Sequence, residues 1–226
     1  MTKKIFTFIL ALLAIATTAG AQGGVVINTK NFPFTNFRKF VKDNYDKDHD
    51  NYLNQGEIAA VTKINVFNRS IGDLKGIEFF MELEELDCRQ NQLTSLDVSQ
   101  NTKLTELCCY NNQIKGDKMQ ALVNSLPTVE GEEKGKFYVI NTKNENEKNV
   151  ITKSQVAIAK GKGWTVYDYN GGSAVEYEGS DGTTGIGGVE ADGLDKAAWY
   201  TLDGKKLSGE PTRKGVYIYK GRKVVK

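Results

Sequence analysis

Hydrophobic positions in the middle of the chain recur with a period of about 21 residues. Apolar residues follow the spacing L-x-x-L-x-[LC]-x-x-N-x-L, first from Leu83 and again from Leu104. An imperfect copy begins at Val61, with Arg69 where the later copies have asparagine. A repeat of this length predicts stacked units, because each unit buries its apolar side only against its neighbours.

The polar positions between these apolar residues predict a short strand in each unit. Successive side chains of a strand point to opposite faces, so Leu86 and Cys88 are expected to point inward and Asp87 outward. Asn91 and Asn112 are expected to bond backbone groups at the bend that follows. The spacing is that of leucine-rich repeats, with the first copy as the capping repeat.

Two longer connections extend the repeats toward the C-terminus. Helical patterns at 117–125 and 152–160 each precede a strand pattern, at 137–140 and 164–167. Alternation of strands and helices predicts a parallel sheet. The expected fold class is therefore α/β, a short leucine-rich-repeat solenoid over residues 58–170.

The flanking segments differ from the repeats in composition. Residues 1–21 have the basic, apolar and small-residue regions of a secretory signal peptide, and no later apolar run is long enough to span a membrane. Residues 171–193 hold eight glycines and are expected to form a flexible linker. Residues 194–226 alternate apolar and polar positions around glycine turns, which predicts a small β unit.

An acidic segment within residues 22–57 has the spacing of a twelve-residue EF-hand loop. Patterns at 35–44 and 55–62 predict a helix on either side. Asn51 stands at the sixth position in place of glycine, and asparagine tolerates the left-handed backbone needed there. The alternative is a solvated acidic turn without metal. The expected Ca²⁺ ligands are Asp46, Asp48, Asp50, the carbonyl of Tyr52, Asn54 and Glu57.

Charge and candidate nucleophiles argue against two functional classes. Two of the 30 basic residues lie in the signal peptide, so the mature chain balances 28 basic against 28 acidic residues and has no basic stripe for nucleic acid. The single histidine, His49, lies inside the acidic loop, where it cannot complete a Ser-His-Asp or Cys-His arrangement. We therefore expect a protein that is not an enzyme.

The outward face of the predicted sheet is the candidate binding surface, because solenoids bind partners on such faces. Exposed tyrosine and arginine suit protein interfaces. The alternative is that neighbouring rings only cover one another, and a shift of one residue would turn the last two strands over. The expected partner-binding row is Phe67, Arg89, Tyr110, Ile140 and Tyr167.

The three cysteines leave at least one thiol outside any internal disulfide. Cys88 and Cys109 share the inward register of adjacent strands, which favours a buried ladder. A bridge between them would be strained, because both side chains point the same way. Cys108 is expected to face outward.

The repeats, the EF-hand-like segment and the C-terminal unit together resemble exported leucine-rich-repeat surface proteins of Bacteroidetes. The last residues, with the turn Asp203-Gly204 and the strand 216–219, are similar to their type IX C-terminal sorting domains. The resemblance implies a β-sandwich-like ending, export through the inner membrane, and display on the cell surface or secretion. It also implies adhesion-like binding of a protein or host-matrix ligand.

Two functions from different classes follow. In the first, the protein is a non-enzymatic binding module that uses its sheet face. In the alternative, it is a calcium-stabilised structural surface protein whose partner site lies elsewhere.

Overall fold

The computed structural model describes residues 23–181, 199–201, 207–219 and 222–225. The predicted signal peptide lies outside these residues. Among the described residues, every helix is too short or too polar to cross a membrane.

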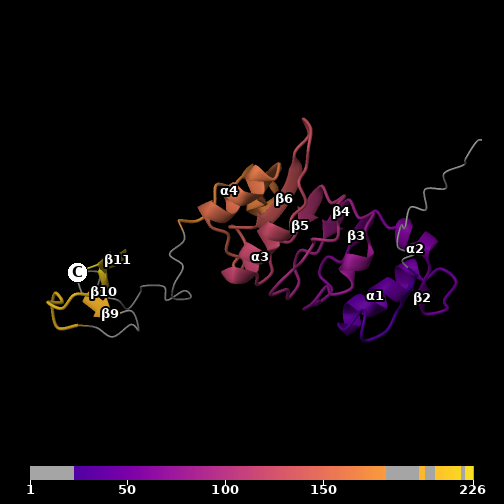
Figure 1. Ribbon diagram of the computed structural model, residues 1–226, viewed down its shortest axis with the longest axis horizontal. Coiled ribbons are helices and arrows are strands. Elements are labelled where there is room, and N and C mark those ends of the chain that lie inside the picture. The colour runs from indigo at the N-terminus through magenta and orange to yellow at the C-terminus, as the bar shows by residue number, and fades with distance from the viewer. Residues whose placement is uncertain (1–22, 182–198, 202–206, 220–221, 226) are drawn as a thin grey trace, which may run out of the picture.

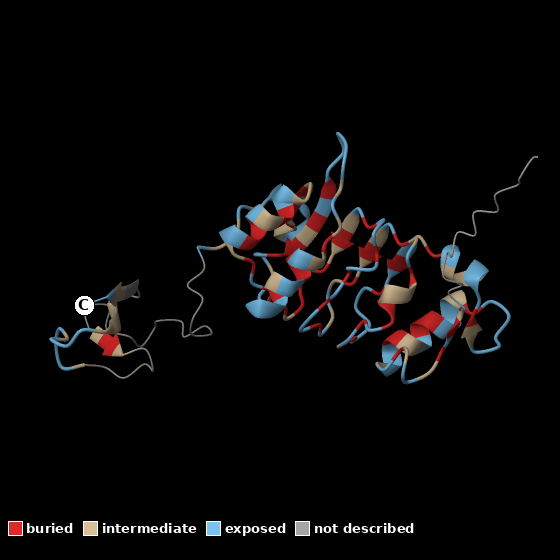
Figure 2. Cartoon of the chain, in the orientation of Figure 1, coloured by how far each residue is buried: buried red, intermediate tan, exposed pale blue. Residues whose placement is uncertain are grey.

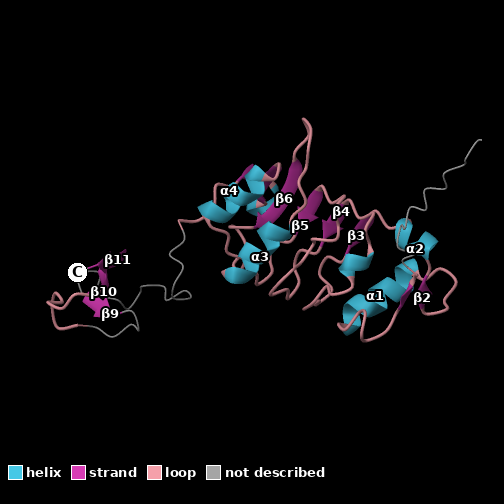
Figure 3. Ribbon diagram, in the orientation of Figure 1, coloured by secondary structure: helices cyan, strands magenta, loops and turns pink. Residues whose placement is uncertain are grey.

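The repeats form one sheet of six strands in the order of the sequence, and the first four can be followed along the molecule in Figures 1 and 3. Five are parallel, as the strand–helix alternation predicted, and the last is antiparallel to its neighbour. The sheet thus consists of β3 (Lys63–Asn65), β4 (Glu85–Asp87), β5 (Glu106–Cys108), β6 (Gly135–Ile140), β7 (Trp164–Asp168) and β8 (Val175–Glu176).

One apolar row runs through the sheet in register and forms the centre of the core. It consists of Ile64, Leu86, Leu107, Phe137 and Val166, all at most 1% exposed. Three connecting elements contribute apolar residues to the same buried cluster: the 3₁₀ helix η1 (Ile77–Phe79), α3 (Asp117–Ser125) and α4 (Lys153–Gly161). Buried positions therefore alternate with exposed ones along the repeats (Figure 2).

Asparagine side chains connect the repeats where the strands end. Asn91 donates to the carbonyl oxygens of Val66 and Cys88, at 2.8 and 3.0 Å. Asn112 donates in the same way to Cys88 and Cys109. The predicted role of these two asparagines is confirmed. A third, Asn149, continues the ladder with bonds to the carbonyls of Cys109 and Val139.

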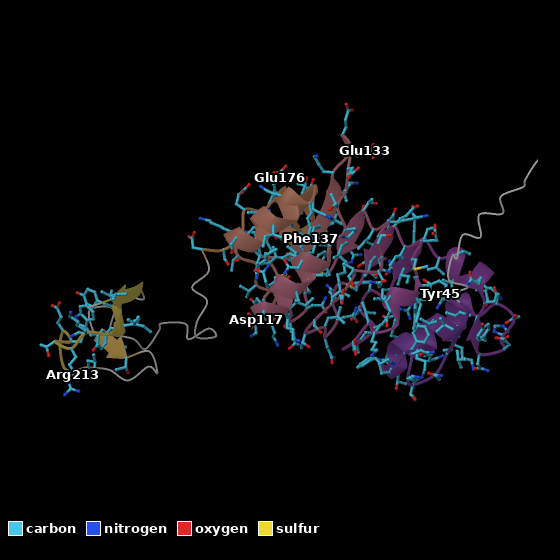
Figure 4. All side chains as sticks on the ribbon, in the orientation of Figure 1. Tyr45, Asp117, Glu133, Phe137, Glu176 and Arg213 are labelled. Carbon is cyan, nitrogen blue, oxygen red and sulfur yellow. The ribbon has the colours of Figure 1, made fainter. Side chains whose placement is uncertain are left out.

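The N-terminal segment covers the open end of the solenoid. It contains β1 (Val25–Val26), α1 (Thr35–Tyr45), β2 (Tyr52–Leu53) and α2 (Gln55–Ala59). Tyr45 lies where this segment meets the repeats (Figure 4). Its ring packs 5.5 Å from that of Phe80, and its hydroxyl donates to the carbonyl of Lys63. Such packing removes the exposed apolar end that a solenoid would otherwise have.

The second flanking helix is shorter than the pattern 55–62 predicted. α2 ends at Ala59, because the chain turns at once into the first strand of the sheet. The carbonyl of Thr62 already accepts hydrogen bonds from the amides of Glu84 and Glu85 in the next repeat. The residues that would have formed the next helical turn therefore pair with the neighbouring repeat instead.

The sheet continues into the segment predicted to be a linker. Residues 175 and 176 form β8, and the amide of Tyr177 donates to the carbonyl of Val166. The amide of Ser180 donates to the carbonyl of Ile151, and the carbonyl of Ser180 accepts from the amide of Lys153. Residues 171–181 thus belong to the repeat unit, whereas the glycine count alone had suggested a flexible connection. Residues 182–193 lie outside the described residues.

The C-terminal unit contains an antiparallel sheet of β9 (Trp199–Thr201), β10 (Val216–Tyr219) and β11 (Arg222–Val225). The predicted strand at 216–219 is present, but its side chains are all half-buried rather than alternating. The predicted turn at Asp203-Gly204 lies outside the described residues, and the β-sandwich-like character of the unit stays a prediction.

Candidate functional site

Three residues of the predicted partner-binding row contact one another on the outward face of the sheet. The Arg89 guanidinium lies 4.7 Å from the ring centroid of Phe67 and 5.7 Å from that of Tyr110. The same guanidinium donates a hydrogen bond of 2.9 Å to the Tyr110 hydroxyl. An arginine held between two rings is restricted in its rotamers before any partner arrives.

Asp87 holds the other side of the arginine. Its carboxylate lies 3.3 Å from Nε of Arg89, and both side chains are partly exposed. Burial raises the pKa of Asp87, and the positive charge of Arg89 opposes that rise. Because part of each group is already withdrawn from water, a partner pays less to desolvate this pair than a fully solvated one.

The assignment of Ile140 to the exposed row is wrong. Ile140 is 8% exposed and belongs to the buried apolar cluster. A β-bulge between Tyr138 and Ile140 interrupts the alternation at the end of β6. Tyr110 and Tyr169 follow β5 and β7, the strands on either side of β6, and their rings stack with centroids 4.6 Å apart.

The same stack changes the role of Tyr110. This residue is only 3% exposed, so its ring contacts Arg89 but is not accessible to a partner. Tyr167 is half-buried on the outward face, but in the neighbouring row, where it pairs in register with Tyr138. Both residues therefore differ from the exposed positions that the sequence predicted.

Tyr138 is a residue of this face that the sequence analysis missed. Its ring stacks on that of Tyr167 with centroids 4.9 Å apart and an interplanar angle of 20°. The signal was available, because Tyr138 lies one position after the inward Phe137 and so points outward. The exposed part of the face thus consists of Phe67, Arg89, Tyr138 and Tyr167, which we call the aromatic face.

A row of opposite charges borders the aromatic face at the start of the strands. Lys63 pairs with Glu85 at 2.6 Å, and Lys136 pairs with Glu106 at 3.7 Å. These ion pairs join adjacent strands and leave much of each side chain in water. Their contribution to stability is small, but they give the aromatic face a polar rim.

The cysteines lie as predicted. Cys88 and Cys109 are fully buried and Cys108 is half-buried, and all three are free thiols. Burial raises the pKa of Cys108 to about 12. A thiol that stays protonated at neutral pH is a poor nucleophile.

The acidic loop brings three of its predicted ligands together. Asp46, Asp48 and Asp50 each offer a carboxylate oxygen, and these oxygens lie within 4.8 Å of one another. Glu57 reaches back over the loop, where its carboxylate accepts from the amide of Lys47 at 2.6 Å. Asn51 adopts φ 66°, the left-handed conformation that was expected of it.

Asp46 is the most unusual of these carboxylates. It is 1% exposed and accepts hydrogen bonds from the amides of Asp50 and Asn51. No lysine, arginine or histidine of the described residues pairs with it in an ion pair. A buried carboxylate with only backbone donors is the kind of group that a cation stabilises.

Known proteins resemble part of this chain. No family model matches the chain. A stretch of 71 residues, 31% of the chain, is 36% identical to Internalin J of Listeria monocytogenes serotype 4b (strain F2365). The match spans only 8% of that protein's length.

Solved structures of the same bacterium give partial superpositions. The functional domain of InlJ, which includes a cysteine ladder, is 27% identical with a TM-score of 0.43, over 63% of this chain and 28% of that one. Internalin C2 is 19% identical with a TM-score of 0.45, over 64% and 67%. The likeness of this chain to internalins thus consists of the chain's own repeat pattern and of the 71-residue match to Internalin J.

Proposed function

We propose that this protein is an exported, non-enzymatic binding module that holds a protein partner against the aromatic face of its sheet. One observation carries the proposal: the Arg89 guanidinium lies between two aromatic rings on an open parallel sheet. Arginine and tyrosine are the residues that contribute most to protein interfaces. The 71-residue match to Internalin J supports the same class.

The exposure of the aromatic face favours a binding surface over the alternative that its rings only cover one another. Phe67 remains 39% exposed although it contacts Arg89. The stacked pair of Tyr138 and Tyr167 is half-exposed. Rings already fixed by their neighbours lose little conformational freedom when a partner covers them, so more of the contact energy appears as affinity.

Substitution of residues outside the buried core tests this surface. The double variant Phe67→Ser, Tyr138→Ser removes two rings of the aromatic face. The matched control Met81→Ser, Val150→Ser removes two apolar side chains that are as exposed as Phe67 and lie outside the sheet strands. In pull-downs from extracellular host proteins, we expect a partner retained by the wild type and the control but lost by the face variant. Equal retention by both variants would refute the use of this face.

We further propose that the acidic loop binds Ca²⁺ and stabilises the N-terminal segment. Asp46, Asp48, Asp50 and Glu57 would supply side-chain oxygens, with the carbonyl of Tyr52 and with Asn54, the donor types that Ca²⁺ prefers. The burial of the Asp46 carboxyl group, which among the described residues accepts hydrogen bonds only from backbone amides, supports the proposal. The second candidate function, a calcium-stabilised structural protein with its partner site elsewhere, rests on this same loop.

Isosteric variants separate a calcium site from a solvated acidic turn. Asp48→Asn and Glu57→Gln each remove one ligand charge, and glutamine still serves the capping box of α2. Asp43→Asn, on α1 outside the loop, is the matched control. Calcium at 100 times its Kd would add about 2.7 kcal/mol to the unfolding free energy. We expect the melting temperature to rise in the wild type and the control only; no rise in the wild type would leave a solvated turn.

For the C-terminal unit we propose a role in sorting to the cell surface or the medium. The β9–β11 sheet and the basic end of the chain support this role, which rests on the resemblance to sorting domains. Deletion of residues 194–226 should leave the repeats folded but retain the protein inside the cell envelope. Normal release of the truncated chain would contradict it.

A further inference from the structure

A pocket of about 370 Å³ lies beyond the ends of the parallel strands, beside the asparagine ladder. Its wall is almost entirely carboxamide. The two ladder asparagines Asn91 and Asn112 line it, and their amide groups are occupied by backbone bonds. The remaining lining residues are Gln90, Asn111, Gln113, Asn144, Asn146 and Lys148.

Asn111 is the residue that distinguishes this pocket from a polar surface hollow. It is 6% exposed, yet neither its Nδ2 nor its Oδ1 has a hydrogen-bond partner. The neighbouring Asn112 satisfies its amide within the ladder, so the fold itself gives Asn111 no such role. A buried polar group without a partner is costly, and a ligand in the pocket would provide that partner.

Lys148 provides the positive charge of the pocket. No ion pair forms to Lys148 among the described residues. The adjacent Glu147 is turned to the backbone, where its carboxylate accepts from the amides of Asn111, Asn141 and Asn149 at 2.7 to 2.9 Å. The carboxylate of Glu147 is therefore held by backbone amides, and the ammonium group of Lys148 remains available to a ligand.

We propose that this pocket binds a saccharide residue that carries a carboxylate. A carboxamide donates and accepts at once, and so does a hydroxyl, so a wall of amides complements the vicinal hydroxyls of a sugar ring. Lys148 then pairs with the carboxylate. The volume lies within the roughly 300–1,000 Å³ of small-ligand sites, and the absence of apolar side chains from the described lining disfavours a hydrophobic ligand.

This site is separate from the aromatic face but adjoins it. Gln90 directly follows Arg89, and Asn111 directly follows Tyr110. A glycosylated partner could thus contact both surfaces. The saccharide site does not depend on the protein partner, since its residues and its ligand are different.

Titration of the ¹⁵N-labelled protein with glucuronic acid tests the proposal through the side-chain amide resonances of Asn111. Glucose has the same ring without the carboxylate, and cyclohexanecarboxylic acid has the carboxylate without the hydroxyls. We expect saturable shifts with glucuronic acid, weaker binding of glucose, and no shift with cyclohexanecarboxylic acid. No saturable shift with glucuronic acid, or equal binding of either control compound, would overturn the proposal.

Two variants and one control locate the binding. Asn111→Asp keeps the size and left-handed backbone of the residue but adds a repelling charge, and should weaken glucuronic acid binding about tenfold or more. Lys148→Gln, at an exposed position, should weaken glucuronic acid and leave glucose unchanged. Asn68→Asp is the control, because Asn68 takes the equivalent left-handed position of the first repeat outside the pocket. Unchanged binding in Asn111→Asp or Lys148→Gln would refute the site.

Discussion

The amide of Asn112 bonds to two repeats at once. It donates to the carbonyls of Cys88 and Cys109 and accepts from the amide of Leu93 at 2.9 Å. The sequence predicted this role because Asn112 recurs 21 residues after Asn91. It did not predict Asn149, because the inserted helix α3 places this third asparagine 37 residues further on.

Loss of the Asn112 side chain should destabilise the whole solenoid. In Asn112→Ala, buried backbone groups of adjacent repeats lose their partners, each at a cost of about 1–3 kcal/mol. We expect urea denaturation to show a loss of about 2 kcal/mol or more in the free energy of unfolding. Gln92→Ala, at an exposed neighbouring position, should be close to neutral; similar losses in both would contradict the role of the ladder.

Tyr110 should ionise at unusually high pH. Burial raises its pKa to about 12 from the ordinary 10. Because the pKa of Tyr110 is higher in the folded than in the unfolded state, the protonated hydroxyl favours folding. This contribution to the unfolding free energy is complete below pH 10 and is lost as the pH rises toward 12. Absorbance titration of the tyrosines should therefore show one group fewer that ionises near pH 12 in Tyr110→Phe than in the wild type. A titration curve identical to that of the wild type would contradict the burial of Tyr110.

At the scale of elements, hydrophobic periodicity predicted the central strands and α3 at its observed bounds. Two features escaped it. α2 ends early because pairing with the next repeat competes for its last residues, and β8 forms within a glycine-rich segment because β7 offers it an edge. Both outcomes depend on neighbours in space that local composition does not encode.

Two glycines around α4 should respond oppositely to alanine. Gly163 has φ 85°, and a Cβ there would lie 2.1 Å from the carbonyl oxygen of Val129. Gly161 is helical and faces open space. We expect Gly163→Ala to cost about 2 kcal/mol or more, and Gly161→Ala to gain up to about 1 kcal/mol, as measured by thermal and urea unfolding. Equal effects would contradict the tight turn between α4 and β7.

For the whole molecule, one continuous apolar cluster runs from the N-terminal segment through the last helix of the repeats. The sequence predicted the solenoid and the acidic loop separately, but not that α1 would seal the end of the core. That contact joins Tyr45 to Phe80, and no periodic signal connects such distant residues. The aromatic face was predicted only in part, because the bulge in β6 and the two tyrosine stacks arise from packing.

Site-specific photo-crosslinking tests the use of the aromatic face most directly. The photoreactive residue p-benzoylphenylalanine replaces Tyr138 on the face or, in the control, Val150 away from the strands, and the protein is irradiated with extracellular host proteins. We expect a specific crosslinked partner from position 138 and none from position 150. A partner crosslinked from position 150 and absent from position 138 would contradict the proposal that this protein binds through its sheet.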